Sequence, residues 1–267
     1  MEYAIQDVAQ IIGARTKALH DCTISILLTD SRRLSFPETS LFFALATKTN
    51  DGHRYVQDLY KLRVRNFVVS KMLPEFEQME EANFLLVKDV LAALQKLVAY
   101  HRKRFQIPVI GITGSNGKTV VKEFLYQLLH NEFDIVRSPR SYNSQIGVPL
   151  SVWEMNEKNT LGIFEAGISQ PDEMEKLQPI IAPTIGVLTS IGEAHQENFI
   201  SVNQKCLEKL MLFNESEAII YDGDNPLIST LIESACLSHK AIAWSRTDRE
   251  APLFIESIEK RQDETVI

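Results

Sequence analysis

The chain has 267 residues, of which 45% are hydrophobic and 24% are charged, and its formal net charge is −7. This length suffices for one large or two ordinary domains, and the net negative charge argues against a nucleic-acid surface, which needs clustered Lys and Arg. No apolar run approaches the roughly 18 residues of a membrane span, and the acidic N-terminus does not resemble a signal peptide. The three cysteines are widely spaced and indicate neither a disulfide framework nor a zinc site. We therefore expect a cytoplasmic protein.

The first part of the chain mixes short strand-like runs with polar turns. Strands are predicted at 24–28, 41–45 and 66–69. Helices are predicted at 56–62 and 90–104, the second because leucines recur at helical spacing. Its basic end, 101–104, suits a helix C-terminus and is interpreted as a solvated helix end rather than a binding surface. We place a domain boundary near residue 88, with this helix leading into the second domain.

From residue 107 onward the pattern changes to an alternation of strands and helices. Short apolar runs bounded by polar turns predict strands at 107–112, 161–164, 185–189, 218–221 and 241–244. Helical patterns lie between them, at 120–130, 171–178, 203–213 and 226–236. Buried parallel strands with covering helices fit this alternation. Polar residues follow the strands, and ligands bind at the carboxyl ends of strands in an open α/β sheet, so several candidate groups converge on one edge.

A glycine-rich segment, Gly111 to Thr119, reads GITGSNGKT and separates a predicted strand from a predicted helix. Its glycines let backbone N–H groups converge on anionic oxygens, and the helix directs the positive end of its dipole there. The strict pattern G-x-x-x-x-G-K-[ST] needs glycine where this chain has Ile112, so an unusual subtype is predicted. We predict a nucleotide site in which Lys118 reaches the phosphates and Thr119 holds magnesium. The alternative is a glycine-rich turn that contains Lys-Thr by chance.

Three further residues near strand ends have side chains that suit this site. Glu165 follows a buried strand, and a magnesium ion that bridges phosphates usually needs one or two protein carboxylates. The alternative for Glu165 is an acid at a strand end that faces solvent. His195 lies in a loop after a strand, and Lys209 lies in a helix. Composition and spacing alone do not distinguish these two from structural or solvated residues.

Several ordered motifs together resemble the ATP-dependent Mur ligases of peptidoglycan synthesis. They are GITGSNGKT at 111–119, SYNSQIGVP at 141–149, EAG at 165–167 and GEAHQENF at 192–199. In addition, DSRR at 30–33 and DGHRY at 51–55 resemble signatures of the family's UDP-binding domain. The resemblance runs from near residue 24 to about residue 226. Within the family, the motifs are most similar to those of the ligases that add D-alanyl-D-alanine.

The resemblance implies a fold and a reaction. A small α/β UDP-binding domain, residues 1–87, would precede a P-loop ATPase domain with a mostly parallel sheet, residues 88–267. ATP, with Mg²⁺, would phosphorylate the terminal carboxylate of a UDP-N-acetylmuramoyl-tripeptide, and the amine of D-alanyl-D-alanine would attack the acyl phosphate. Such a reaction needs charge neutralisation around the phosphoryl group more than covalent help from the protein. Family members carry a third, C-terminal domain, so we expect this chain to be an inactive fragment of a longer enzyme.

The resemblance also assigns roles to side chains. The residues that would bind the nucleotide are Gly114, Ser115, Asn116, Gly117, Lys118, Thr119, Asn143, Asp222 and Asn225. Magnesium ions would be held by Thr119, Glu165, His195 and a carbamylated Lys209. The catalytic residues would be Lys118, His195 and Lys209. The UDP precursor would contact Ser31, Arg32, Asp51, His53 and Ser144.

Two departures from the family pattern affect these assignments. Ser144 stands where a second asparagine is common, and Asp222 stands where an asparagine commonly meets the adenine. Two other functions remain open. One is a folylpolyglutamate-synthetase-like ligase, against which the DSRR and DGHRY segments argue. The other is a non-catalytic nucleotide-binding module, which would have no need of the metal-ligand residues.

Overall fold

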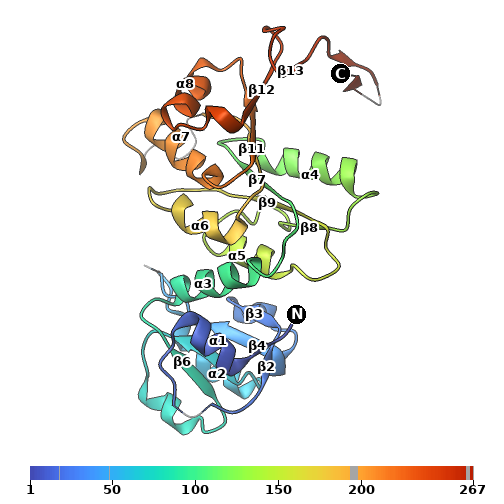
Figure 1. The fold of residues 1–267 in the computed structure, drawn as a ribbon. Coiled ribbons are helices and arrows are strands. Elements are labelled where there is room, and N and C mark those ends of the chain that lie inside the picture. Colours follow the sequence, from blue (N-terminus) through green and yellow to red (C-terminus); the bar gives the residue numbers. More distant parts are fainter. Residues whose placement is uncertain (18, 48, 193–197, 263–264, 267) are drawn as a thin grey trace. The chain divides into compact units, whose positions relative to one another are not determined.

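The structure is a computed structural model that describes residues 1–17, 19–47, 49–192, 198–262 and 265–266 (Figure 1). Its contacts divide the chain into two compact units, Met1–Arg104 and Phe105–Ile267. Each unit is an α/β structure with its own parallel sheet. Among the described helices, none combines the length and apolar character that crossing a membrane requires.

The first unit is built on a four-stranded parallel sheet whose strands lie in chain order. These strands are β3 (Ile26–Leu28), β4 (Ser40–Phe43), β5 (Asn66–Val69) and β6 (Asn83–Leu86). The helices of the unit are α1 (Ile5–Ile12), α2 (Val56–Lys61) and α3 (Val90–Arg102). Near the N-terminus, β1 (Tyr3–Ala4) pairs antiparallel with β2 (Thr23–Ile24). The predicted strands and helices of this region are confirmed, whereas the sequence patterns did not predict α1 and β6.

Aromatic side chains fill one face of this sheet. The Phe67 ring stacks on that of Phe84 with 5.5 Å between centroids, and Phe76 stacks on the same ring at 5.1 Å. Phe42, Phe67 and Phe76 are buried in one apolar cluster. Burying such rings removes a large apolar area from water, so this cluster is a main source of the unit's stability.

Helix α3 packs against α1 and belongs to the first unit. Asp89 caps it by accepting a hydrogen bond from the backbone N–H of Ala92, at 3.0 Å. Of the apolar side chains that recur at helical spacing in α3, Leu94, Leu97 and Val98 are buried and Leu91 is half-buried. The compact units therefore divide after Arg104, later than the boundary expected near residue 88. The periodicity predicts the helix, but only the three-dimensional packing shows which domain its apolar side chains contact.

The second unit is a seven-stranded parallel sheet flanked by helices. The strand order is β13-β12-β11-β10-β7-β9-β8. The strands are β7 (Val109–Thr113), β8 (Ile135–Arg137), β9 (Leu161–Glu165), β10 (Ile185–Leu188), β11 (Ala218–Asp222), β12 (Ala241–Ser245) and β13 (Leu253–Phe254). The helices are α4 (Lys118–Leu129), α5 (Gly147–Trp153), α6 (Met174–Ile181), α7 (Val202–Leu210) and α8 (Pro226–Ser234). A separate antiparallel pair joins β14 (Glu259–Lys260) to β15 (Thr265–Val266).

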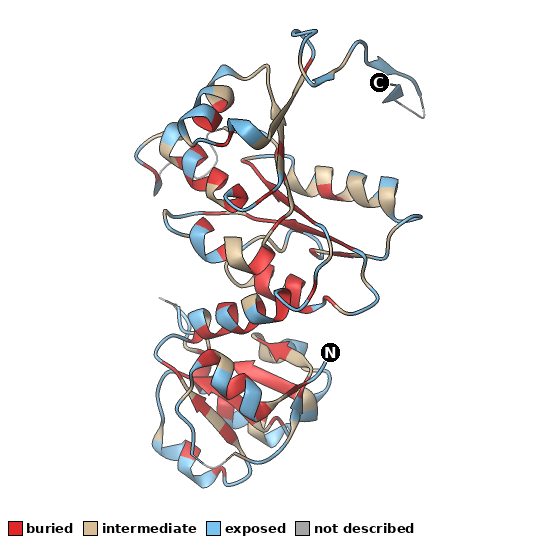
Figure 2. Ribbon diagram, viewed as in Figure 1, coloured by how far each residue is buried: buried red, intermediate tan, exposed pale blue. Residues whose placement is uncertain are grey.

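The central strands of this sheet are buried on both faces (Figure 2). Ile110 and Ile112 of β7 pack in a cluster with the apolar side of α4, which covers one face. Gly111, between them, points to the opposite face, where an added Cβ would lie 2.7 Å from the Pro183 side chain. Successive side chains of a β-strand point to opposite faces of the sheet. Because both faces are covered here, every position is buried and the strands are continuous apolar runs in the sequence. The five strands predicted from 107 onward are confirmed, and β8 and α5 are additional.

Candidate functional site

The glycine-rich loop lies between β7 and α4, at the carboxyl edge of the sheet. Gly114 has φ of 146° and Gly117 has φ of 82°, values that L side chains rarely adopt. A Cβ on Gly114 would lie 1.9 Å from Oγ1 of Thr189, so both space and backbone conformation require glycine there. Lys118 is the first residue of α4, which directs the N-terminal end of the helix dipole into the loop.

Ile112 explains why the loop departs from the strict phosphate-loop pattern. Its side chain is fully buried in β7, in the cluster that packs against α4. The position therefore belongs to the sheet core, and the loop begins after Thr113. Thr113 donates a buried hydrogen bond from its hydroxyl to the carbonyl of Ala166, at 2.9 Å, and so joins β7 to the end of β9.

The segment that follows β10 holds the loop in shape. The backbone N–H of Ser115 donates to the carbonyl of Ser190 at 2.6 Å, and the Ser115 hydroxyl accepts from the N–H of Gly192 at 2.9 Å. The hydroxyl of Thr189 donates to the carbonyl of Asn116 at 2.6 Å. These bonds fix loop carbonyls and side chains from the neighbouring segment and help to hold the loop in this shape.

Three buried or half-buried lysines converge on the loop. The ammonium of Lys118 donates to the carbonyls of Gly114, at 2.8 Å, and Ser115, at 3.3 Å. Lys209 of α7 donates to the carbonyl of Gly114 at 3.1 Å. Lys205, one turn earlier on α7, donates to the carbonyl of Gly192. Three cations placed against neutral carbonyls create a positive potential that suits a polyphosphate.

Burial and mutual repulsion change the pKa values of these lysines. The pKa of Lys118 is lowered, chiefly by burial, although the Glu165 carboxylate opposes this change. The pKa of Lys209 is lowered from 10.5 to about 7, chiefly by burial and also by the charges of Lys118 and Lys205. The Lys209 side chain, only 3% exposed, therefore carries an uncharged amine in a large share of molecules at neutral pH.

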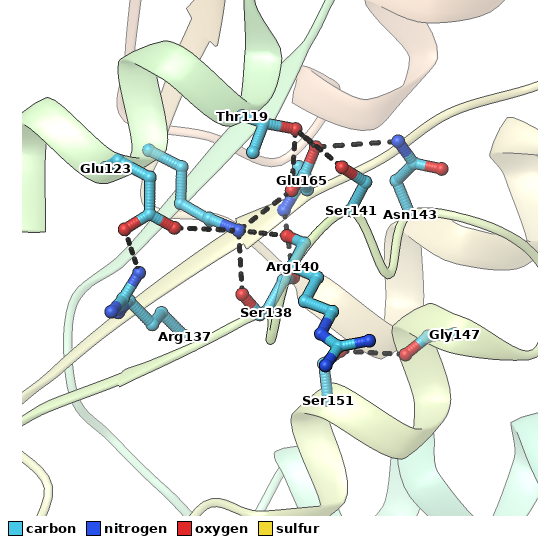
Figure 3. Close-up of polar contacts among 11 residues, drawn as sticks. Thr119, Glu123, Arg137, Ser138, Arg140, Ser141, Asn143, Gly147, Ser151 and Glu165 are labelled. Carbon is cyan, nitrogen blue, oxygen red and sulfur yellow. Dashed lines mark hydrogen bonds and ion pairs between the residues drawn. The ribbon is translucent and has the colours of Figure 1, made fainter.

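Thr119 and Glu165 meet beside the loop (Figure 3). The Thr119 hydroxyl donates to Oε2 of Glu165 at 2.9 Å, although the two residues come from α4 and β9. The amide of Asn143 lies 3.5 Å from the same oxygen. Glu165 is fully buried, so it is not the solvent-facing acid that the sequence left as an alternative.

These groups fit a magnesium ion in their chemistry. Magnesium prefers oxygen ligands and keeps water and phosphate oxygens around it, with one or two protein carboxylates. Thr119 and Glu165 supply a hydroxyl and a carboxylate at one place. Within the described residues, no three His, Cys, Asp or Glu side chains gather closely enough to hold a metal by themselves. A hydroxyl and a carboxylate at one place suit a metal whose other ligands are water and phosphate oxygens.

Other predicted nucleotide- and substrate-site residues are engaged locally. Ser144 accepts a hydrogen bond from the N–H of Gly147 at the start of α5, at 3.1 Å. Asn225 caps α8, and Asp222 accepts from the N–H of Asp224 at 3.0 Å. These bonds neither bring the three residues to the phosphate loop nor test their assigned contacts. His195 lies outside the described residues.

The Asp51–His53 turn of the first unit is held by a chain of hydrogen bonds. The N–H of Ser70 donates to Nε2 of His53 at 3.0 Å, so Nδ1 carries the proton that His53 shares with Asp51, at 2.6 Å. Lys71 pairs with the other Asp51 oxygen at 2.7 Å and, with His53, keeps the pKa of Asp51 well below its usual range. Both ring nitrogens of the buried His53 are thus used within the unit.

Ser31 and Arg32 lie in a short 3₁₀ helix, Ser31–Arg33, that Asp30 caps. Arg32 donates two hydrogen bonds to the Asp30 carboxylate, at 2.9 and 2.8 Å, and its side chain is mostly exposed. This turn follows β3, and the Asp51–His53 turn follows β4, so both groups lie at the carboxyl edge of the first unit's sheet.

Sequence reasoning missed two buried lysines of the site, Lys122 and Lys205. Lys122 lies four residues after Lys118, and Lys205 lies four residues before Lys209. Residues four apart share a helix face, so helical spacing from the predicted lysines could have found both.

Comparison with known proteins decides the family. The model of the Mur ligase middle domain matches residues 112–267. The chain belongs to the Mur ligase family. A UDP-N-acetylmuramoyl-tripeptide–D-alanyl-D-alanine ligase of Bacillus subtilis is 32% identical over 229 residues, covering 84% of this chain and 49% of that protein. The ligase of the same name from Synechocystis is 33% identical over 180 residues, covering 67% and 39%. The chain spans about half the length of the curated relatives it matches.

Solved structures confirm the fold. A crystal structure of MurF from Acinetobacter baumannii superposes with a TM-score of 0.86 at 24% identity, covering 97% of this chain and 56% of that one. The MurF ligase from Thermotoga maritima, solved in complex with ADP, gives a TM-score of 0.76 at 22% identity, with coverages of 90% and 54%. A folylpolyglutamate synthase from L. casei is less similar, at 0.52. The predicted α/β fold with mostly parallel sheets is therefore confirmed.

Proposed function

We propose that this chain carries the ATP-binding and UDP-precursor-binding parts of a UDP-N-acetylmuramoyl-tripeptide–D-alanyl-D-alanine ligase. The observation that supports it most is the contact of Thr119 with the buried Glu165, next to Lys118 at the end of the glycine-rich loop. The identity to ligases of that name adds the substrate class. Residues 1–87 are proposed to form the core of the UDP-precursor-binding part.

In the proposed reaction, the terminal carboxylate of the tripeptide attacks the γ-phosphate of ATP, and ADP leaves. The amine of D-alanyl-D-alanine then attacks the acyl carbon, and phosphate leaves as the amide forms. Lys118 and the loop N–H groups between Gly114 and Thr119, except that of Ser115, bind the β- and γ-phosphates and offset their charge. Bound Mg²⁺, held by Thr119 and Glu165, would neutralise further charge on the transferred group.

Lys209 is proposed to act as a carbamylated metal ligand together with His195. Carbamylation requires an uncharged amine, and the pKa of about 7 supplies one at neutral pH. It would convert a cation into an anionic oxygen donor near Lys118 and Lys205. Asn143, Asp222 and Asn225 are assigned to the nucleotide as a proposal by family resemblance.

The UDP precursor is proposed to bind at the carboxyl edge of the first unit's sheet. Ser31 and Arg32 offer exposed polar groups there, and Ser144 is assigned to the substrate by resemblance. The bonds of Asp51 and His53 support a role in holding the turn beside the ligand. D-alanyl-D-alanine would need parts of the enzyme that the family carries in its C-terminal domain.

Separate calorimetric titrations test this proposal. A non-hydrolysable ATP analogue with Mg²⁺ and, independently, UDP-N-acetylmuramoyl-tripeptide should each bind the chain. Binding of the nucleotide without the UDP precursor would favour a folylpolyglutamate-type ligase or a non-catalytic nucleotide-binding module. If both Lys118→Ala and Glu165→Gln bound the nucleotide as well as the wild type, the proposed nucleotide site itself would be contradicted.

A further inference from the structure

Helix α4 contains a lysine in the position where an amphipathic helix usually buries an apolar residue. Within α4, all of whose residues the structure describes, the fully buried side chain is that of Lys122. Its neighbours one turn away on either side are Lys118, at the phosphate loop, and Tyr126. A buried lysine costs free energy unless its charge is paired and its hydrogen bonds are made, so this position calls for a specific explanation.

The ammonium of Lys122 is surrounded by acceptors (Figure 3). It forms an ion pair with Oε1 of Glu165 at 3.0 Å, and Oε1 of Glu123 lies 3.3 Å away. It also donates to the carbonyls of Ser138, at 2.8 Å, and Arg140. Both Lys122 and Glu165 have no exposed side-chain surface, so this is a fully desolvated ion pair.

The two oxygens of Glu165 consequently differ in their main partners. Oε1 pairs with Lys122 at 3.0 Å and lies 3.3 Å from the Thr119 hydroxyl. Oε2 accepts the shorter hydrogen bond from that hydroxyl, at 2.9 Å, and lies nearest to Asn143. The carboxylate plane is therefore fixed from both sides, with Oε2 closest to the hydroxyl of the proposed magnesium site.

Lys122 also holds the chain segment that completes the surroundings of this site. Its bonds to the carbonyls of Ser138 and Arg140 fix the segment after β8. That segment continues to Ser141, whose hydroxyl lies 3.1 Å from that of Thr119. One ammonium thus connects α4, β9 and this segment where they meet the Thr119–Glu165 pair.

We propose that Lys122 is a positioning residue for the magnesium of the nucleotide complex: it holds Oε1 of Glu165 so that Oε2 points to the metal beside Thr119. This rests on the proposed function, because it assumes a magnesium nucleotide at the loop. The ammonium also repels a metal cation, but without it the carboxylate of Glu165 loses its buried partner and is no longer held in place. A carboxylate that turns away is lost as a metal ligand, so we expect the loss of positioning to outweigh the loss of repulsion.

The test uses calorimetry to measure how Mg²⁺ affects the binding of a non-hydrolysable ATP analogue. Affinity is measured in the presence of a chelator, which removes free Mg²⁺, and then at increasing MgCl₂ concentrations. In Lys122→Met, the Mg²⁺ concentration for half-maximal enhancement should rise by about tenfold or more, the usual effect of losing a partner of a metal ligand. Affinity in chelator should stay within about twofold, because Lys122 contacts no loop group that binds phosphate. In a Glu165→Gln background, Lys122→Met should have no further effect on the Mg²⁺ dependence.

Lys240→Met is the control. It removes a half-buried lysine that donates to the carbonyls of Phe213 and Asn214, before β12 and away from the carboxyl edge of the sheet, so the Mg²⁺ dependence should stay as in the wild type. If Lys122→Met does not fold, Lys122→Gln, which retains hydrogen-bond donors without the charge, replaces it with the same expected direction. If the half-maximal Mg²⁺ concentration of the folded variant is unchanged or lower, the role of Lys122 is overturned while the metal site stands. If Mg²⁺ does not affect nucleotide binding in the wild type, the proposed metal site is overturned as well.

Discussion

The buried pair of Lys122 and Glu165 makes a quantitative prediction about stability that needs no ligand. Lys122→Met leaves a fully buried carboxylate without its cation, together with two carbonyls without their donor. Removing one partner of a buried ion pair destabilises proteins by about 3–5 kcal/mol. For a unit of this size, each kcal/mol lowers the melting temperature by about 2–4 °C, so a decrease of roughly 6–20 °C is expected.

Glu165→Gln should cost less than Lys122→Met. The ammonium of Lys122 then still donates to the carbonyl of Ser138 and still pairs with the carboxylate of Glu123. The Glu123 side chain is 39% exposed, so water also reaches that carboxylate. We expect a loss of about 1–3 kcal/mol, the range for an imperfectly satisfied buried group. The double variant removes both charges, so its loss should be smaller than the sum of the single losses by roughly 0.5–3 kcal/mol.

Intrinsic tryptophan fluorescence during urea unfolding measures these differences in the relevant unit. The chain has two tryptophans, Trp153 and Trp244, and both belong to the second unit. Their signal therefore reports the unit that contains the pair, even if the first unit unfolds in a separate transition. Single losses that add up in the double variant to within about 0.5 kcal/mol would refute the coupling, and with it the view that each charge is buried because of the other.

Three further predictions concern the glycine-rich loop and the lysines around it. Lys118→Ala should weaken nucleotide binding by roughly 10–100-fold in calorimetry, since a hydrogen bond to a charged group contributes about 1.5–3 kcal/mol; unchanged affinity would count against the phosphate site. Gly114→Ala should reduce binding and cost about 1–3 kcal/mol in urea unfolding, because its Cβ would clash with Thr189. Gly192→Ala should be nearly neutral, since among the described residues its Cβ would meet no atom closer than 3.7 Å. The pKa of Lys209 is about 7 when folded and 10.5 ordinarily, so the folded chain binds fewer protons between these pH values and is stabilised as pH rises through them. Lys209→Met should flatten that rise in urea unfolding measured at several pH values; an unaltered slope would contradict the lowered pKa.

The parts of the site that depend on local pattern could be predicted from the sequence. A strand, a glycine turn and a helix in succession define the backbone of the phosphate loop, and the structure has Lys118 and Thr119 at the start of α4 as that pattern requires. The position of Glu165 at the end of β9 also follows, because parallel strands bring their carboxyl ends to one edge. Its contact with Thr119 follows from the adjacency of β7 and β9.

The contacts that the sequence could not predict depend on tertiary packing. Lys122 reads as one more solvated helix lysine, because its partners Ser138, Arg140 and Glu165 come from two other segments. In the same way, the periodicity of α3 predicts a helix but not that α1 covers its apolar side. Pairings between segments far apart in the sequence carry no local signal, so the sequence does not show that α3 packs with the first compact unit.

A polar side chain assigned to a ligand from the sequence can also make local hydrogen bonds within the fold, as Asn225 and His53 do. Asn225 was assigned to the nucleotide, yet its side chain accepts the N–H groups that begin α8. His53 was assigned to the UDP precursor, yet both ring nitrogens join its turn to Ser70 and Asp51. Polar side chains serve caps and turns as often as ligands, and the sequence does not show which use applies.

The lysines of this site differ in the groups to which they donate, and this difference bears on function. Lys118 and Lys209 donate to neutral loop carbonyls, which a phosphate can replace without breaking an ion pair. Lys122, one turn beyond Lys118 on the same helix, faces carboxylates instead. If Lys118 were the partner of Glu165, phosphate binding would first have to break a buried ion pair, at a large cost. By pairing Glu165 with Lys122, the fold keeps Lys118 available for the nucleotide and holds the carboxylate in place.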